Sequence, residues 1–238
     1  MFVNIIILCV AAVALWFVLP FVWRLMLERR LGRLCQKNRA IVLTYDDGPS
    51  AGLSRDLVDL LNRHKVQATF FMLGRNAVAA PEIVAHINAG GHEIGSHSQQ
   101  HYNAWKAAPW AVWRDIAAGR ATLTGFGARA DLFRPPFGKI TLAGLLQAGL
   151  SGLGFAFWTV DSRDSWDRRP IDDVLAELTE KGGGVLLMHD TDRAARGPAP
   201  DQHRQYVLDL TTRVIEFAAG NNFTLMPLGA LEQKGSSL

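Results

Sequence analysis

Two pairs of residues in the first half of the chain have types and spacing that suit metal-dependent hydrolysis. Asp46 and Asp47 are adjacent carboxylates at the end of an apolar run, and a Gly-Pro turn follows them. Two like charges this close raise the free energy unless a cation or a proton lies between them. His97 and His101 stand four apart, which predicts two imidazoles on one face of a helical turn. One Asp with two His leaves a coordination position open for water, as catalytic zinc sites do.

Three more polar clusters follow apolar runs in the second half of the chain. Arg134 begins the motif RPPFG, and its guanidinium can pair with a carboxylate. Residues 158–166 hold two tryptophans and two acids, and His189 ends another apolar run. Taken singly, each cluster also fits a plain turn or a hydrogen-bonded side chain. The order of the clusters along the chain is therefore the more specific signal.

Short apolar runs alternate with helical patterns from residue 40 onward, which predicts a parallel α/β sheet. The strands are expected at 40–45, 67–73, 92–95, 131–134, 153–160, 185–188 and 223–226. The helices are expected at 54–64, 81–89, 109–122, 142–148, 171–181 and 205–218. About seven such units predict a distorted (β/α) barrel, with the polar clusters on one rim at the carboxyl ends of its strands.

Two features of this scaffold bear on what the protein binds. Residues 193–205 form the clearest long loop, and its part around Pro198–His203 is expected to influence specificity. Trp110 and Trp113 share one face of a helix that begins at Pro109. We expect both tryptophans to pack in the core, the alternative being a surface that faces a membrane or stacks on sugar.

The N-terminal segment is long and apolar enough to be a transmembrane helix. Residues 2–23 contain no charged side chain and would span roughly 33 Å as a helix, enough for the core of a bilayer. A cleaved signal peptide is the alternative, but it would carry a positive n-region and small residues at its cleavage site. We therefore divide the chain into a membrane anchor at 1–23, a basic juxtamembrane linker at 24–39 and a catalytic domain at 40–238.

The positive charge of the chain is concentrated next to this segment. Residues 24–39 hold six basic side chains and one acidic one, so the rest of the chain is slightly acidic although the net charge is +3. A basic surface for nucleic acid is therefore not expected. Positive charge directly after a membrane span favours a cytoplasmic location for the domain that follows, and the opposite side of the membrane is the alternative.

The motifs TYDDGPS, HSQQH, RPPFG, DSRDSW and LLMHD stand in an order that resembles the NodB-homology polysaccharide deacetylases. The resemblance covers residues 40–230. It implies a hydrolase that cleaves the linear amide bond of N-acetylated sugars. It also implies that Asp47, His97 and His101 bind a divalent metal, zinc being expected and Co²⁺, Ni²⁺ or Mn²⁺ the alternatives. In the family pattern, Asp46 is the general base.

The same resemblance implies roles for residues of the later motifs. Arg134 would orient the base, and His189 would be the acid that protonates the leaving amine. Leu187 would receive the acetyl methyl group. The backbone N–H of Phe137 would stabilise the oxyanion, although the family usually has tyrosine at this position.

The motif at 161–166 departs from the family pattern and leaves alternatives open. Ser165 separates Asp164 from Trp166, whereas the family usually has the tryptophan directly after the acid. Asp164 is still preferred over Asp161 as the acid that tunes the catalytic histidine. Trp166 either lines the acetyl pocket or belongs to the core.

These observations predict a membrane-anchored deacetylase of an N-acetylamino sugar in a lipid-linked or nascent glycan. The expected location is the bacterial inner membrane, with a single span and the catalytic domain in the cytoplasm. The alternatives are a deformylase of a lipid-linked amino sugar and a periplasmic deacetylase of peptidoglycan or exopolysaccharide. A non-enzymatic glycan-binding module is not favoured, because base, ligands, arginine and acid are all present. The expected partners are the glycan and the membrane, without nucleic acid.

Overall fold

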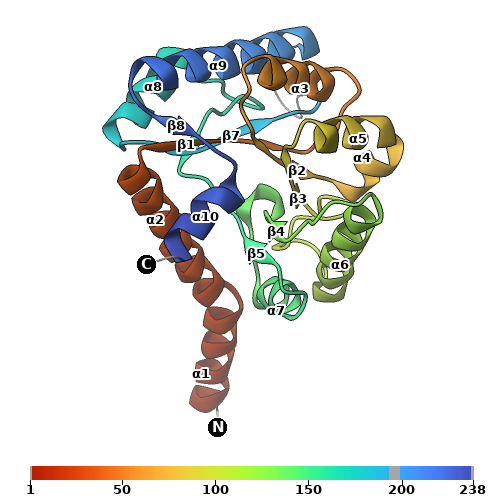
Figure 1. Cartoon of the computed structure of the whole chain (residues 1–238). Helices are drawn as coiled ribbons and strands as arrows, with labels where there is room; N and C mark the ends of the chain where they lie inside the picture. Colours follow the sequence, from red (N-terminus) through yellow and green to blue (C-terminus); the bar gives the residue numbers. More distant parts are fainter. Residues whose placement is uncertain (1, 193–198, 237–238) are drawn as a thin grey trace.

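A curled parallel sheet lies at the centre of the protein in the computed structural model, which describes residues 2–192 and 199–236 (Figure 1). Its strands are β1 (Ala40–Asp46), β2 (Thr69–Met72), β3 (Glu93–Ser96), β4 (Leu132–Phe133), β5 (Gly154–Phe155), β6 (Val160–Asp161), β7 (Gly184–His189) and β8 (Thr224–Leu225). Their order is β5-β4-β3-β2-β1-β7-β6, with β8 also paired to β1, and all these pairs are parallel. The expected (β/α) barrel is confirmed, as a barrel left open because no described pair joins β5 to β6.

Helices cover the outside of this sheet (Figure 1). They are α3 (Leu53–Arg63), α4 (Gly74–Ala79), α5 (Pro81–Ala89), α6 (Pro109–Gly125), α7 (Leu142–Leu150), α8 (Ile171–Glu180), α9 (Pro200–Gly220) and α10 (Leu228–Ser236). Helices α4 and α10 lie where the sequence pattern predicts none. Helix α4 has only six residues and α10 contains two glycines, so neither carries a helical apolar stripe that stands out.

Strand β1 is buried along its whole length, which explains why its sequence is a continuous apolar run. Ile41, Leu43 and Tyr45 belong to a core cluster shared with α3, α5, α8 and α9. Ala40 and Val42 point the opposite way, into a second cluster. Packing on both faces thus fixes the strand, and with it the position of its last residue, Asp46, at the rim.

The apolar run at 153–160 predicts a single strand, but the structure has two short strands at opposite ends of the sheet, β5 and β6. Between them the chain leaves the sheet, and the carbonyl oxygen of Phe157 accepts a hydrogen bond of 3.2 Å from Nη2 of Arg134. Arg134 is fully buried, so its N–H donors need acceptors inside the protein. The carbonyl group of Phe157 therefore accepts a hydrogen bond from the arginine and not from a neighbouring strand.

Two expectations about helices are wrong. His97 and His101 lie in a loop and not on a helical turn, since Ser98 and His101 have φ values of 75° and 65°. Trp110 and Trp113 are 67% and 36% exposed, so they do not pack in the core. The apolar stripe of α6 runs instead through other positions, which α4 and α7 cover.

The expected long loop at 193–205 is shorter than the sequence indicates. Helix α9 begins at Pro200, so residues 200–205 are helical, and His203 is buried within it. Proline suits the first turn of a helix because its missing N–H would have no partner there. Residues 193–198, including Pro198, lie outside the described residues.

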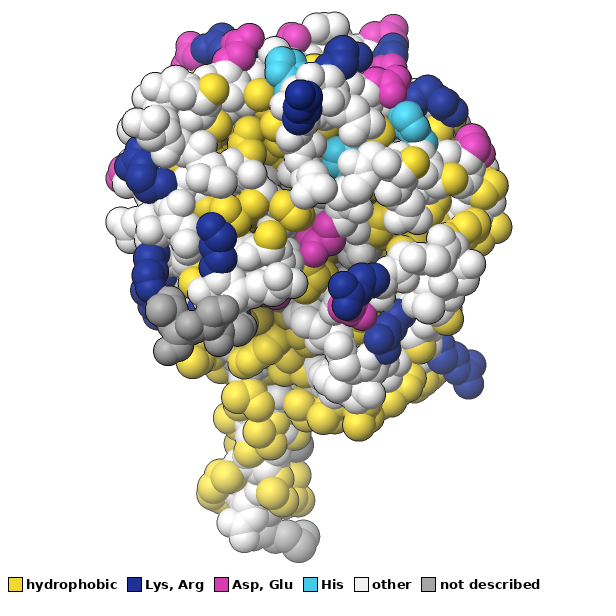
Figure 2. All heavy atoms as spheres, in the orientation of Figure 1, with side chains coloured by type: hydrophobic (Ala, Val, Ile, Leu, Met, Phe, Trp, Pro, Cys, Tyr) yellow, Lys and Arg dark blue, Asp and Glu magenta, His cyan; other side chains and the backbone are white. Residues whose placement is uncertain are grey.

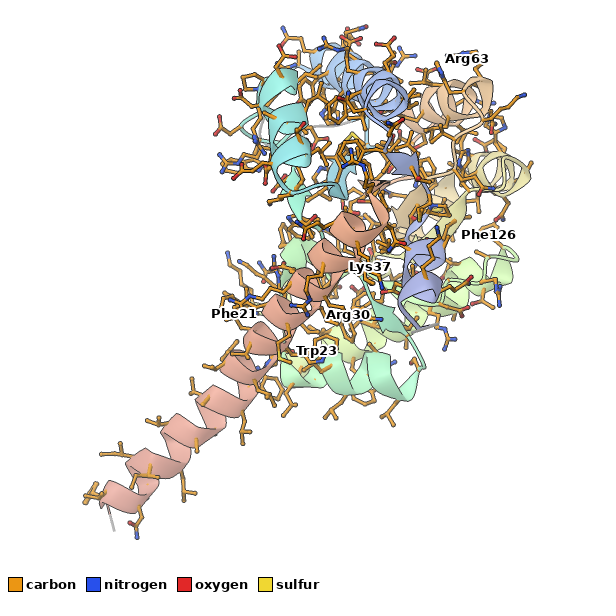
Figure 3. All side chains as sticks on the ribbon, turned by 60° about the vertical axis from the view of Figure 1, so that its left-hand side comes forward. Phe21, Trp23, Arg30, Lys37, Arg63 and Phe126 are labelled. Carbon is orange, nitrogen blue, oxygen red and sulfur yellow. The ribbon has the colours of Figure 1, made fainter. Side chains whose placement is uncertain are left out.

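The N-terminal segment is helical from Phe2 to Asn38, as α1 (Phe2–Val13), a π-helical stretch (Ala14–Val18) and α2 (Leu19–Asn38). By length and composition it fits a membrane span or a signal sequence. Its first part projects from the body, as Figure 1 shows, whereas Pro20, Leu31 and Cys35 are buried against the domain. In Figure 3, Phe21, Trp23, Arg30 and Lys37 are labelled along this helix. The basic segment at 24–39 is therefore a packed helix as far as Asn38.

Candidate active site

The polar clusters meet at the carboxyl ends of the strands because the sheet is parallel. Asp46 ends β1 and pairs in register with His189, which ends β7. His97 follows β3, and Arg134 follows β4. Strands with a common direction bring these ends to one edge. The register of the sheet, rather than any local motif, assembles the candidate site.

Asp47, His97 and His101 converge on one point. Oδ1 of Asp47 lies 3.1 Å from Nε2 of His101 and 3.4 Å from Nε2 of His97. The three atoms lie within 4.8 Å of one another, and Oδ1 of Asp47 is buried without a hydrogen-bond partner among the described residues. A buried oxygen beside two imidazole nitrogens is a donor set that fits a divalent metal.

His97 is held in the tautomer that a metal ligand needs. Its Nδ1 lies 2.7 Å from the carbonyl oxygen of Arg134, so Nδ1–H donates and Nε2 keeps a lone pair directed at Asp47. Burial lowers the pKa of His97 to about 3, which leaves the imidazole neutral at physiological pH. The backbone after β4 thus orients a ligand that follows β3.

The loop that carries the two histidines is fixed by helix α6. Asp115 is buried on this helix and accepts the backbone N–H of Gln100 at 2.7 Å. Gly119, one turn further on, lets the helix lie close to the loop, since a Cβ there would be 2.4 Å from the carbonyl carbon of Ser98. The sequence signal for Asp115 is an acid among the buried positions of α6, and our sequence reasoning did not use it.

Asp46 forms a buried ion pair with Arg134. Nη1 of Arg134 donates to Oδ1 of Asp46 at 2.7 Å and to Oγ1 of Thr44 at 2.8 Å. Burial raises the pKa of Asp46 above its ordinary value, and the charge of Arg134 opposes that rise. The pair therefore places a carboxylate with tuned basicity next to Asp47 and 3.8 Å from Nε2 of His97. Thr44 is the first residue of the motif TYDDGPS, but our sequence reasoning gave it no role.

Asp164 holds His189 through both of its carboxylate oxygens. Nδ1 of His189 lies 2.9 Å from Oδ1 of Asp164, and the backbone N–H of His189 donates to Oδ2 at 2.8 Å. Burial lowers the pKa of His189, but the buried Asp164 more than offsets this and raises it to about 10. His189 is thus protonated at neutral pH. Asp161 instead accepts the backbone N–H of Arg163 at 2.8 Å.

The other residues named from the sequence lie around this centre. Leu187 is buried two residues before the histidine on β7. Phe137 is 55% exposed, has a φ of 58°, and its ring centroid is 4.5 Å from that of His101. Trp166 is 56% exposed beneath the guanidinium of Arg163, so it does not belong to the core.

Asp190 is a buried acid that sequence reasoning placed in a cluster without giving it a role. It accepts the backbone N–H of Gly48 at 3.0 Å and the hydroxyl of Ser54 at 2.6 Å. Burial raises its pKa to about 7. A Cβ at Gly48 would be 2.1 Å from Oδ2 of Asp190, so only glycine fits there. Asp190 therefore fixes the turn that aims Asp47.

Comparison with known proteins agrees with this geometry. Residues 33–155 match the family model described as polysaccharide deacetylase. A chitooligosaccharide deacetylase of Bradyrhizobium sp. (strain ANU 289) is 30% identical over 156 residues, which cover 64% of this chain and 71% of the relative. A chitooligosaccharide deacetylase of Azorhizobium caulinodans is 30% identical over 203 residues, which cover 82% of this chain and 96% of the relative.

A longer relative and two solved structures are also similar. The peptidoglycan-N-acetylglucosamine deacetylase PgdA of Listeria monocytogenes is 35% identical over 158 residues, 64% of this chain but only 33% of the relative. The family 4 carbohydrate esterase from Streptomyces lividans superimposes with a TM-score of 0.66 at 27% identity, covering 77% of this chain and 90% of that one. The structure of peptidoglycan deacetylase PdaC from Bacillus subtilis superimposes with a TM-score of 0.67 at 25% identity, and the match covers 83% of this chain and 92% of that one. The chain belongs to the polysaccharide deacetylase family and is a carbohydrate deacetylase, a hydrolase that acts on N-acetyl amide bonds.

Proposed function

We propose that this protein removes the acetyl group from an N-acetylamino sugar in a membrane-associated glycan, either lipid-linked or nascent. The observation that carries the proposal is the placement of the Asp47, His97 and His101 ligand set beside two buried pairs, Asp46–Arg134 and Asp164–His189. One pair offers a proton acceptor and the other a proton donor, on one rim. Hydrolysis of an amide needs both, because water loses a proton and the leaving amine gains one.

The metal ligands in this proposal are Asp47, His97 and His101. Two imidazoles and one carboxylate suit zinc, with Co²⁺, Ni²⁺ and Mn²⁺ as the other candidates. A divalent ion held there supplies Lewis acidity, which makes water nucleophilic near neutral pH and stabilises negative charge on a carbonyl oxygen. The unpartnered Oδ1 of Asp47 supports this assignment.

Asp46 is the general base in this proposal, and Arg134 is its positioning residue. The guanidinium fixes the carboxylate with one 2.7 Å hydrogen bond, and its positive charge opposes the rise in the pKa of Asp46 that burial causes. The second carboxylate oxygen is left to accept a proton from the attacking water. The base thus acts from a fixed position, which is worth a large part of the rate in general-base catalysis.

His189 is the general acid, and Asp164 is the residue that positions it. Asp164 keeps the imidazole protonated and fixes its ring, so that Nε2–H faces the site. Leu187 receives the acetyl methyl group, and Trp166 borders the same region. Phe137 provides its backbone N–H to the developing oxyanion, and it lacks the hydroxyl that tyrosine would offer to substrate.

We further propose that residues 1–23 anchor the protein, that 24–39 form a basic juxtamembrane segment, and that 40–238 are the catalytic domain. The arginines after the apolar helix favour a cytoplasmic location for that domain at the bacterial inner membrane. A fusion of a reporter after residue 238 tests the orientation. Activity of a periplasm-dependent reporter would overturn the cytoplasmic location and favour a periplasmic glycan.

The chemical test is hydrolysis by the purified full chain with quantification of the released acid. We expect acetate from a soluble chitooligosaccharide and from a lipid-linked N-acetylhexosamine, and loss of both activities with a chelator. Release of formate in place of acetate would favour a deformylase. Full activity of His97→Ala, or activity that survives complete removal of metal, would contradict the proposed site.

A further inference from the structure

The N-terminal helix is free of the domain only over its first part. Residues of α1 with described side chains are exposed throughout, and α1 has 12 residues. From Ala14 onward one face of the helix contacts the domain, and Pro20 on that face is buried. Twelve helical residues span about 18 Å, whereas the core of a bilayer is about 30 Å thick. A helix that crosses the bilayer must therefore carry the adjoining part of the domain into the lipid.

The part of the domain that adjoins residues 14–23 is apolar. The ring of Phe17 packs edge-on against Trp105 at 6.1 Å between centroids. Helix α7 contacts the same stretch and contains no charged side chain. Its outer face presents Leu146 and Leu150, which are 53% and 77% exposed, while its one polar residue, Gln147, is buried. Figure 2 shows hydrophobic side chains along the edge of the body from which the helix projects.

Cationic side chains border this face. Lys139 lies over the ring of Trp105 with Nζ 4.9 Å from its centroid, and Lys106 is exposed next to the same tryptophan. Arg24 follows the apolar part of the helix and bonds to Glu28 and to the carbonyl of Gly138. An apolar face bordered by tryptophan and basic residues matches the layering of a bilayer, with hydrocarbon next to anionic headgroups.

We propose that the domain is seated in the bilayer through the outer face of α7 and Trp105, which we call the lipid-seating face. The occupant is a phospholipid leaflet, entered to the depth of residues 14–23 of the helix. This inference rests on the membrane anchoring proposed above. It adds that the domain is partly immersed and is not suspended from a linker.

The lipid-seating face is tied to the rim of the active site. Nη1 of Arg24 donates to the carbonyl oxygen of Gly138 at 2.6 Å, and Nε1 of Trp105 donates to that of Ile140 at 3.1 Å. These two bonds hold the loop in which Phe137 contacts the ring of His101. The mouth of the metal site therefore borders the surface of the lipid. A sugar joined to a membrane lipid is the substrate class that this placement favours.

The depth of the face can be measured with nitroxide labels on the full chain in phospholipid nanodiscs. The label is placed at Leu150→Cys in a Cys9→Ala background, in which the remaining Cys35 is buried. Val10→Cys reports the span, and Arg213→Cys on α9 reports the opposite end of the body (Figure 1). Collision rates with oxygen, which dissolves in lipid, and with a water-soluble nickel chelate give the depth of each label.

We expect the labels at positions 10 and 150 to collide with oxygen in preference to the chelate, and the label at 213 to show the reverse. A lipid-exposed position 10 with a water-exposed position 150 would overturn the seating face and leave the anchor intact. A label at 150 shielded from both reagents would also overturn it, in favour of a second copy of this chain. Water exposure at position 10 would overturn the anchor, and the seating face with it.

An activity comparison provides the second readout. Leu150→Glu and Leu146→Glu are expected to lose rate on a lipid-linked N-acetylhexosamine in vesicles and to keep the full rate on a soluble chitooligosaccharide. Val78→Glu on α4 is the matched control, because Val78 is apolar and 60% exposed, and α4 lies apart from α7 and the N-terminal helix (Figure 1). Equal loss on both substrates, or equal loss in the control, would contradict a role for this face in substrate access.

Discussion

Arg134 and Asp46 form an ion pair inside the protein, with Nη1 of the arginine 2.7 Å from Oδ1 of the carboxylate. Both side chains are almost completely buried, and the guanidinium also contacts Thr44 and the carbonyl of Phe157. A charge taken out of water is tolerated only when its partner is present. The pair links catalysis to stability, because the same contact orients the base and neutralises a buried charge.

Asp46→Asn tests the base. Asparagine keeps an oxygen for Arg134 but cannot accept a proton, so we expect kcat to fall by about 10²- to 10⁴-fold with little change in KM. The melting temperature should fall as well, because the buried guanidinium of Arg134 loses its counter-charge. Steady-state kinetics and thermal unfolding measure the two effects. Asp59→Asn is the control, since Asp59 pairs with His86 away from the site. Unchanged kcat in Asp46→Asn would remove this residue from catalysis.

Arg134→Met tests the structural half of the same pair. It leaves the Asp46 carboxylate buried without its partner, and we expect the free energy of unfolding to fall by about 3–5 kcal/mol. The double variant Asp46→Asn/Arg134→Met carries no buried charge at this place and should be more stable than Arg134→Met alone. Denaturant titration of both variants decides the point. Equal stability of the two variants would show that Arg134 does not stabilise the protein by neutralising the buried charge of Asp46.

Metal binding should stabilise the folded protein. A ligand that binds only the folded state adds about 2.7 kcal/mol at a concentration one hundred times its Kd. We therefore expect zinc to raise the melting temperature of the chelator-treated protein, and His101→Ala to lose most of that rise. His86→Ala should keep it, because His86 lies outside the ligand set. A rise of equal size in His101→Ala would place the ion elsewhere.

The contact between Asp164 and His189 predicts a loss of stability at high pH. Burial alone would lower the pKa of His189, but Asp164 raises it to about 10 in the folded protein. A raised pKa contributes stability that is complete below the ordinary histidine pKa and is lost as the pH rises through the folded value. Denaturant titrations from neutral pH to about pH 10 should therefore show a fall in the free energy of unfolding. Asp164→Asn should be less stable at neutral pH and should lack most of that fall.

The alternation of apolar runs and helical patterns was enough to predict the parallel barrel. Strand β1 and helix α5 lie where the pattern places them, because a strand buried on both faces and a proline-initiated helix both have strong local signals. The prediction of one strand at 153–160 was wrong because the middle of this apolar run is buried near Arg134 without pairing as a strand. Tertiary contacts of a buried charge are not visible in a local pattern.

The residues of the candidate site could be named from the sequence, but their local geometry could not. A spacing of four predicts a helical turn, yet His97 and His101 converge from a loop whose backbone visits the left-handed region. Asp115 and Gly119 impose that path from α6, the helix that follows the histidine loop along the chain, through contacts that form only when the helix packs against the loop. Thr44 and Asp190 stand in the motifs TYDDGPS and LLMHD but received no role from the sequence, because their contacts form only once the strands are in register.

The close approach of α6 to the histidine loop gives a test of how the site is built. A Cβ at Gly119 would lie 2.4 Å from the backbone of Ser98, so Gly119→Ala must displace either the helix or the loop. Gly125→Ala on the same helix has nothing within 4 Å of the added carbon and should be neutral or stabilising by up to about 1 kcal/mol. We expect Gly119→Ala to weaken zinc binding and to lower kcat, measured by zinc titration and by acetate release. If Gly119→Ala binds zinc as tightly as Gly125→Ala does, the packing of α6 does not set the position of His97 and His101.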